Sequence, residues 1–371
     1  MIGHVIRLSR IAFWTTLILL ISLGSLLSML HRSHSQVRAL LVDYRNSLVT
    51  RFEPDSGFFR LPPEALVGRG FNTDSFGVID AWRPRLAKVA PIPVDVSKMD
   101  EIDQIKTIVL SFSRPGSGHS TYFMPLTEKT SEAQRGNGFC SDHVEVFLSL
   151  ARIHGLFARE IQTDVHDVAE VFSPSRQQWI WVDPFFAVLA LDEQGSYLSY
   201  LEIRRRRLTG LPVHFLFFGH AGSQPQSEAD AKFSQLYGDP SHFKTYVLTY
   251  GNNVLTEASR SESIAFVPWE ARQLVLYVLG TKPHLLQLVD SFVDRRAIDN
   301  TWRRALLLWT IFAYCALSLA SYPLLAVVSR GVWKSRQHSP IAEIGEAKRS
   351  PGAGVSHEDQ LNSPRARVLY R

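Results

Sequence analysis

Residues 135–184 read RGNGFCSDHVEVFLSLARIHGLFAREIQTDVHDVAEVFSPSRQQWIWVDP. Cys140 follows a glycine-rich turn and opens an apolar segment whose hydrophobic residues recur at helical spacing. Gly155 can end this helix, so we expect Cys140 at or near a helix N-terminus. The unpaired N–H groups and the helix dipole at that end favour the thiolate, which is the nucleophilic form of cysteine.

Three short strands are expected after this helix. Hydrophobic patterning predicts them over residues 158–162, 166–172 and 178–183. His166 begins the second strand and Asp183 ends the third, so antiparallel pairing would bring them within reach of a hydrogen bond. A helix packed on this sheet can bring Cys140 to the other imidazole nitrogen. That is the arrangement of nucleophile, base and orienting group known from the serine hydrolases.

Three sequence words in this order carry a resemblance to a known family. The resemblance is to motifs of the transglutaminase-like superfamily, relatives of the papain-like cysteine proteases, and lies in GFCSDHVEVFLSLARIHGLFARE, HDVAEVF and WIWVDP. It suggests a membrane-anchored, bacterial-type member of that superfamily. The resemblance covers roughly residues 100–190. It implies an α+β fold with a papain/transglutaminase-like core, in which the cysteine lies at the N-terminus of a helix packed on an antiparallel sheet. It also implies that Cys140 is the nucleophile, His166 the general base and Asp183 the orienting acid.

The sequence departs from the family at one position beside the histidine. The second residue after the family histidine is usually aromatic, often Trp, and here it is Val168. The three proposed catalytic residues are unaffected by this difference. The shape of the substrate cleft is expected to differ.

Two further polar residues have candidate roles near these three. An acyl-transfer intermediate needs preorganised donors for its oxyanion, and Gln134 precedes Cys140 by a spacing similar to that of papain-like enzymes. The backbone N–H of Cys140 is a second candidate donor. Glu170 lies on the same strand face as His166, where we expect it to form a structural ion pair, with Arg159 as candidate partner.

A metal site is the competing interpretation of the same cysteine. Cys140, His143 and His154 are ligand types for zinc, but on one helix Cys140 and His154 would lie about 21 Å apart. The chain has two cysteines and no CxxC pair, although such pairs are common in structural zinc sites. We therefore expect no metal and no cofactor.

Charge and hydropathy indicate a membrane protein. The 371 residues are 45% hydrophobic with a formal net charge of +5, yet residues 31–304 alone carry −1. The basic excess therefore belongs to the two ends and does not indicate nucleic-acid binding. Residues 11–30 and 305–328 are uncharged apolar runs, each long enough to cross a hydrocarbon core of about 30 Å as a helix. A cleaved signal peptide is the alternative for the first run, but no A-x-A site follows it.

These runs divide the chain into seven segments. We expect a cytoplasmic tail (1–10), a transmembrane helix (11–30), a stalk and irregular part (31–96), the transglutaminase-like core (97–210), the C-terminal part of the same domain (211–304), a second transmembrane helix (305–328) and a basic, disordered cytoplasmic tail (329–371). The positive-inside rule places both tails in the cytoplasm, because the C-terminal tail carries the clearer basic excess. The central domain would then be extracytoplasmic, and the protein is expected in a bacterial inner membrane. Since Cys140 is its only cysteine, an intrachain disulfide is not expected.

A run of four arginines, Arg204, Arg205, Arg206 and Arg207, lies near the end of the predicted core. It is interpreted either as a solvated face or as a contact for an anionic partner, such as a lipid headgroup or an acidic glycan.

Two functions from different classes fit these observations. The first is a membrane-anchored thiol enzyme that hydrolyses amide bonds, or transfers their acyl groups, in a protein or peptide-like substrate of the cell envelope. The second is a non-catalytic transglutaminase-like module for binding or assembly in cell-envelope or polysaccharide export machinery. Labelling of Cys140 by a thiol-reactive probe, with and without His166, distinguishes the two.

Overall fold

The computed structural model divides the chain into two compact units, Met29–Phe312 and a unit that combines Met1–Ser28 with Ala313–Arg371. It describes residues 13–25, 28, 51–53, 57–69, 71–92, 95–113, 119, 121, 124–163, 165–219, 226–245, 247–249, 251–267 and 286–288. It also describes residues 272, 276, 306, 310, 313–314, 316–321, 323, 327 and 330.

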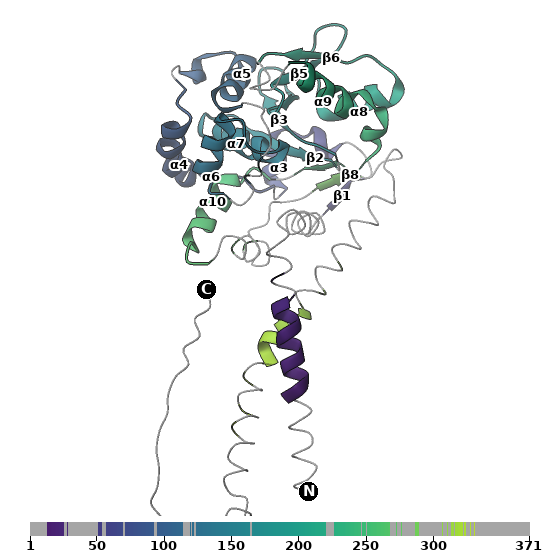
Figure 1. The fold of residues 1–371 in the computed structure, drawn as a ribbon. Helices are drawn as coiled ribbons and strands as arrows, with labels where there is room; N and C mark the ends of the chain where they lie inside the picture. The colour runs from purple at the N-terminus through teal and green to yellow at the C-terminus, as the bar shows by residue number, and fades with distance from the viewer. Residues whose placement is uncertain are drawn as a thin grey trace, which may run out of the picture. The chain divides into compact units, whose positions relative to one another are not determined.

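In the unit of the two chain ends, residues 13–25 form a helix, coloured purple in Figure 1. The Tyr314 hydroxyl donates to the Leu19 carbonyl over 3.2 Å and also contacts the Ser22 hydroxyl. No helix among the described residues has the length and apolar character needed to cross a membrane. The runs 11–30 and 305–328 are described only in part, and the tails 1–10 and 331–371 lie outside the described residues. Both membrane spans therefore stay predictions.

The larger unit is built on one sheet of eight described strands, in the order β1-β8-β7-β2-β3-β4-β5-β6. The strands are β1 (Arg51–Glu53), β2 (Ala158–Gln162), β3 (Asp167–Ser173), β4 (Gln178–Asp183), β5 (Val188–Leu191), β6 (His214–Phe217), β7 (Val247–Thr249) and β8 (Leu286–Leu288). Neighbouring strands are antiparallel except β1 and β8, which are parallel. The α+β class with an antiparallel sheet is confirmed. β2 and β4 have the predicted bounds, and β3 begins one residue later than predicted.

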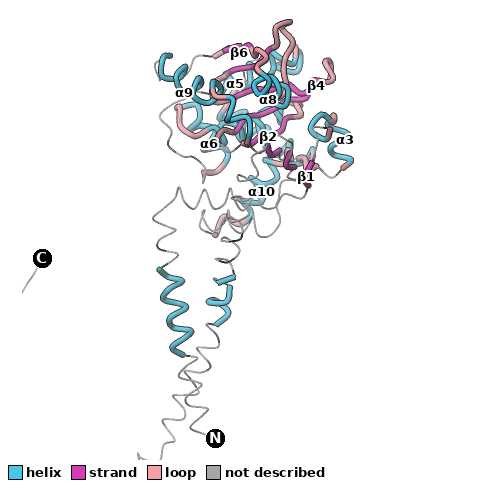
Figure 2. The backbone as a smooth tube through the Cα atoms, turned by 90° about the vertical axis from the view of Figure 1, so that its right-hand side faces the viewer, coloured by secondary structure: helices cyan, strands magenta, loops and turns pink. Residues whose placement is uncertain are grey.

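Helices cover both faces of this sheet (Figures 1 and 2). They are α3 (Pro63–Gly68), α4 (Phe76–Val89), α5 (Glu101–Phe112), α6 (Leu126–Gln134), α7 (Cys140–Ile153), α8 (Tyr200–Thr209), α9 (Gln226–Gly238) and α10 (Val254–Ser263). On β4, Ile180 and Val182 pack into a core with α4, α5, α7 and α10, whereas Trp179 and Trp181 pack into a second core with α8 and α9. A strand buried on both faces has a continuous apolar sequence, which explains the four apolar residues WIWV at positions 179–182.

The expectation of a stalk and irregular part over residues 31–96 was wrong for residues 63–89, which contain α3 and α4, while residues 31–50 lie outside the described residues. Proline and glycine suggested loops there, but Pro63 occupies the first turn of α3, where a missing N–H costs nothing. Pro84 lies inside α4, which still buries Ile79, Trp82 and Leu86 along one face. Packing of that apolar stripe outweighs the helix-breaking effect of one proline.

Residues 211–304 contribute strands to the same sheet as residues 97–210. β6 and β7 come from residues 211–304, yet β6 pairs with β5 and β7 pairs with β2, on opposite sides of the predicted core. Ile161 of β2 lies opposite Thr249 of β7. Pairing between such distant residues has no local sequence signal, so the sequence did not indicate it.

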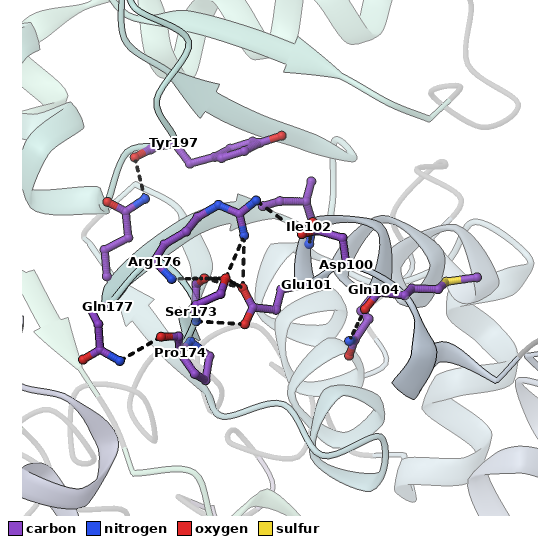
Figure 3. A network of polar contacts seen from close by, with 12 residues as sticks. Asp100, Glu101, Ile102, Gln104, Ser173, Pro174, Arg176, Gln177 and Tyr197 are labelled. Atoms are coloured by element: carbon purple, nitrogen blue, oxygen red, sulfur yellow. Dashed lines mark hydrogen bonds and ion pairs between the residues drawn. The ribbon is translucent and has the colours of Figure 1, made fainter.

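A polar network ties the start of α5 to the turn between β3 and β4 (Figure 3). Glu101 accepts hydrogen bonds from the Ser175 backbone N–H (3.1 Å), the Arg176 guanidinium (3.0 Å) and the Ser173 hydroxyl. Burial alone would raise the pKa of Glu101, but the hydrogen bonds from Ser173 and Ser175 and the charge of Arg176 hold it below its ordinary value. The network anchors the hairpin at the end opposite to His166 and Asp183.

Candidate active site

The first turn of α7 positions Cys140, a half-buried free thiol at the first residue of the helix. The turn before it needs glycine, since Gly138 has φ +100° and a Cβ there would lie 3.1 Å from the Asp142 Cβ. Asp142 accepts the Phe139 N–H at 2.9 Å, and the buried Lys129 lies 3.3 Å from its other oxygen. These contacts fix the helix start, where the first N–H groups have no carbonyl of their own helix to bind.

His166 and Asp183 are hydrogen-bonded, with 2.7 Å between His166 Nε2 and Asp183 Oδ2. The Asp183 side chain is fully buried, and only 8% of the His166 side chain is exposed. The hydroxyl of Thr163 accepts the His166 N–H at 3.1 Å and donates to the His166 carbonyl at 2.9 Å. This small loop sets the direction in which His166 enters β3.

The Cys140 side chain is a neighbour of the His166 ring and contributes to its pKa. Because Nε2 binds Asp183, Nδ1 is the nitrogen left for the thiol. Burial alone would lower the pKa of His166, but the Asp183 charge, the nearby Cys140 and hydrogen bonds to both raise it well above the ordinary value. The structure thus brings together the three residues that the sequence singled out.

Tyr237 of α9 is a member of this cluster that the sequence did not indicate. Its hydroxyl donates to Asp183 Oδ2 over 2.7 Å, and its side chain is buried. Burial first, and the neighbouring Asp183 charge second, raise the pKa of Tyr237 well above 10. Tyr237 lies 54 residues after Asp183 in a segment without a motif, so no local signal could have identified it.

Aromatic side chains enclose the cluster. The Phe185 and Phe186 rings lie 6.4 Å and 5.8 Å from the His166 ring, between centroids. His143, one turn after Cys140, is buried with its ring 5.0 Å from Phe185, and its Nδ1 lies 3.1 Å from the Phe139 carbonyl. Burial lowers the pKa of His143, which keeps this second imidazole neutral. The charge-bearing groups of the cluster therefore lie in a largely apolar setting.

The Gln134 amide is engaged elsewhere. It donates to the Ser111 carbonyl over 3.1 Å, so the predicted role as oxyanion donor would require this bond to be exchanged. The first N–H groups of α7 are the donors that lie next to Cys140. Glu170 forms the predicted ion pair with Arg159, with 2.6 Å between their charged atoms, which confirms its structural role. Val168 is buried in the second core.

The four arginines do not form one exposed patch. Arg204 is buried, with its Nε donating to a backbone carbonyl at 2.7 Å. Arg206 pairs with Glu193 at 2.7 Å, Arg207 donates to a backbone carbonyl at 2.7 Å, and Arg205 is exposed. The run lies on α8, where successive side chains point about 100° apart, so one of four consecutive residues faces the core. The arrangement does not support a four-arginine contact for an anionic partner.

In the described part of the chain, no three His, Cys, Asp or Glu side chains are grouped as they would be around a metal ion.

Comparison with known proteins identifies no relative: no protein-family model, no curated protein and no solved structure matches this chain. The arrangement of Cys140, His166 and Asp183 is therefore the observation on which a functional proposal depends.

Proposed function

We propose that this chain is a thiol enzyme of the transglutaminase-like type, which acts on amide bonds of a protein or peptide-like substrate. The observation that carries the proposal is the Asp183–His166 hydrogen bond of 2.7 Å, with Cys140 beside the same imidazole at the start of a helix. A nucleophile, a base and a buried orienting carboxylate in hydrogen-bonded series are the requirements for covalent acyl transfer.

The chemistry follows from the roles of the three side chains. The Cys140 thiolate attacks the amide carbonyl carbon, and the oxyanion that forms is stabilised by N–H groups at the start of α7. The C–N bond then breaks while the His166 imidazolium gives its proton to the leaving amine, which leaves a thioester on Cys140. Neutral His166 next takes a proton from water or from an amine, whose attack releases an acid or a new amide. Asp183 holds the ring orientation through both halves.

The helix and sheet around these residues agree with the proposal. α7 begins at the cysteine and packs on β2 and β3, while the histidine and aspartate lie at adjacent ends of β3 and β4. This is the arrangement that the resemblance to the transglutaminase-like superfamily implies. Choice between water and amine depends on the acceptor and on its access to the thioester.

Labelling of Cys140 in the purified full chain tests the proposal. We expect a dilute iodoacetamide probe to modify Cys140 at neutral pH, and His166→Ala to slow this labelling by about 10²-fold or more, because the thiolate loses its cationic partner. Mass spectrometry of the modified peptide measures the rate. Cys140→Ser should abolish the labelled peptide.

His154→Ala is the matched control. His154 is a half-buried histidine at the other end of the same helix, so its loss should leave the rate within about twofold, as for a change outside the site. Equal labelling of the wild type and His166→Ala would remove the support for thiol catalysis. The non-catalytic assembly module would then be the better interpretation.

A further inference from the structure

We propose that Tyr237 is a positioning residue of this site, whose hydroxyl shares Asp183 Oδ2 with His166 and thereby adjusts how strongly the carboxylate holds the imidazolium. The proposal rests on the proposed thiol chemistry and adds a fourth residue to it. That residue comes from α9, outside the part of the chain in which the family motifs lie.

The hydrogen bonds of Asp183 carry the first step. Oδ2 receives His166 Nε2 and the Tyr237 hydroxyl, each at 2.7 Å, while Oδ1 receives the N–H groups of Phe185 (2.9 Å) and Phe186 (3.2 Å). Bonds of 2.7 Å to a carboxylate are in the range of charge-assisted hydrogen bonds. Because both side-chain donors share one oxygen, the negative charge available to His166 is smaller than in a carboxylate without Tyr237.

The packing of Tyr237 carries the second step. Its ring lies 4.5 Å from Phe233, 5.4 Å from Phe215 and 5.6 Å from Trp181, between centroids. These contacts hold the hydroxyl in place without help from Asp183. Phenylalanine at this position therefore keeps the packing and removes the donor alone, which makes the substitution a clean test.

The effect of the hydroxyl on His166 has a definite sign. A donor on Oδ2 stabilises the carboxylate and reduces its attraction for the imidazolium, so His166 loses its proton at lower pH than it would without Tyr237. The titratable and charged groups around the cluster are Cys140, Asp142 and His143 of α7, His166, Asp183, Tyr200 of α8, and Lys232 and Tyr237 of α9. Only Tyr237 and His166 donate to Asp183 through their side chains in the described residues.

The rate of Cys140 alkylation as a function of pH, in the full chain, provides the experiment. In the wild type the rate should change at the pH at which His166 loses its proton. In Tyr237→Phe we expect this inflection to move to higher pH. Replacing Tyr237 by 3-fluorotyrosine, a stronger donor that keeps the ring, should move it to lower pH.

Tyr200→Phe is the control, because Tyr200 is a buried tyrosine of the same core whose backbone N–H binds Glu170. Its profile should match that of the wild type. An unchanged inflection in Tyr237→Phe, with labelling that still depends on His166, would overturn the role of Tyr237 and leave the proposed function intact. The same shift in Tyr200→Phe would also overturn it. Labelling that does not depend on His166 in the wild type would overturn both.

Discussion

Asp183 is fully buried, with a relative exposure of 0%, and accepts four hydrogen bonds. A buried carboxylate without partners would be strongly unfavourable, so both of its oxygens must accept hydrogen bonds in the folded state. At this residue the requirements of folding and of the proposed chemistry coincide. The same bonds that satisfy the carboxylate also orient His166 toward Cys140.

The raised pKa of His166 links its ionisation to stability. Because the folded-state pKa lies above the unfolded value, His166 contributes its full stabilisation below about pH 6.5, and this is lost as the pH rises through the folded-state pKa. In Asp183→Asn the charge that raises the pKa is removed. We expect this variant to lose most of that pH dependence, and to label about 10²- to 10⁴-fold more slowly, since an uncharged partner cannot hold the imidazolium.

Urea unfolding at a series of pH values above 6.5, together with the labelling rate, measures both effects. Asp192→Asn is the comparison variant, because Asp192 accepts backbone N–H groups in a turn that contains Gln194 and Ser196. It should keep the wild-type labelling rate. If Asp183→Asn labels as fast as Asp192→Asn, the orienting role is wrong.

At the scale of the elements, β2 and β3 are joined by a buried charge pair as well as by backbone bonds. Arg159 and Glu170 lie directly opposite each other in the strand register, and each side chain is 1% exposed. Arg159 also lies 3.7 Å from the Trp179 ring centroid, and Glu170 accepts the Tyr200 N–H at 2.7 Å. The pair thus connects β2, β3, β4 and the start of α8.

Removing one partner of this pair should be costly. We expect Glu170→Ala to lower the free energy of unfolding by about 3–5 kcal/mol, because Arg159 would be left as a buried charge without its carboxylate. Asp80→Ala, which removes a pair with Arg83 whose side chains are 66% and 55% exposed, should cost less than about 1 kcal/mol. Urea denaturation of both variants compares them. Similar losses in the two would contradict a structural role for the buried pair.

Local patterns predicted some elements well and others not at all. The bounds of β2 and β4 and the start of α7 follow from hydrophobic spacing and a glycine-rich turn within a few residues. α4 was missed because its proline was given more weight than the spacing of Ile79, Trp82 and Leu86. The Gln134 amide was assigned by spacing to Cys140, whereas its partner, Ser111, is on a different helix.

At the scale of the whole molecule, the sheet joins the predicted core to segments that precede and follow it in the chain. The predicted core supplies β2 to β5, and residues outside it supply β1, β6, β7 and β8. α9, also outside it, brings Tyr237 to Asp183. The candidate site is therefore completed by a segment that carries none of the family motifs.

The orientation in a membrane is a prediction at this same scale. From the two predicted spans and the basic C-terminal tail, we expect alkaline phosphatase fused after Arg371 to be inactive in bacterial cells, because the positive-inside rule predicts a cytoplasmic tail. A fusion made after residue 304, which retains only the first apolar run, should be active. Phosphatase activity from the full-length fusion would overturn the proposed extracytoplasmic position of the central domain.

The sequence by itself determined where the cysteine helix and the three central strands lie, and which cysteine, histidine and aspartate to examine. Periodicity, turn residues and strand ends are properties of neighbouring residues, so a single chain displays them directly. Only the tertiary structure decided that Tyr237 shares an oxygen of Asp183 with His166, that Gln134 binds Ser111, and that one arginine of four is buried. These outcomes depend on which distant surfaces pack together, and burial then selects the partner of each polar group.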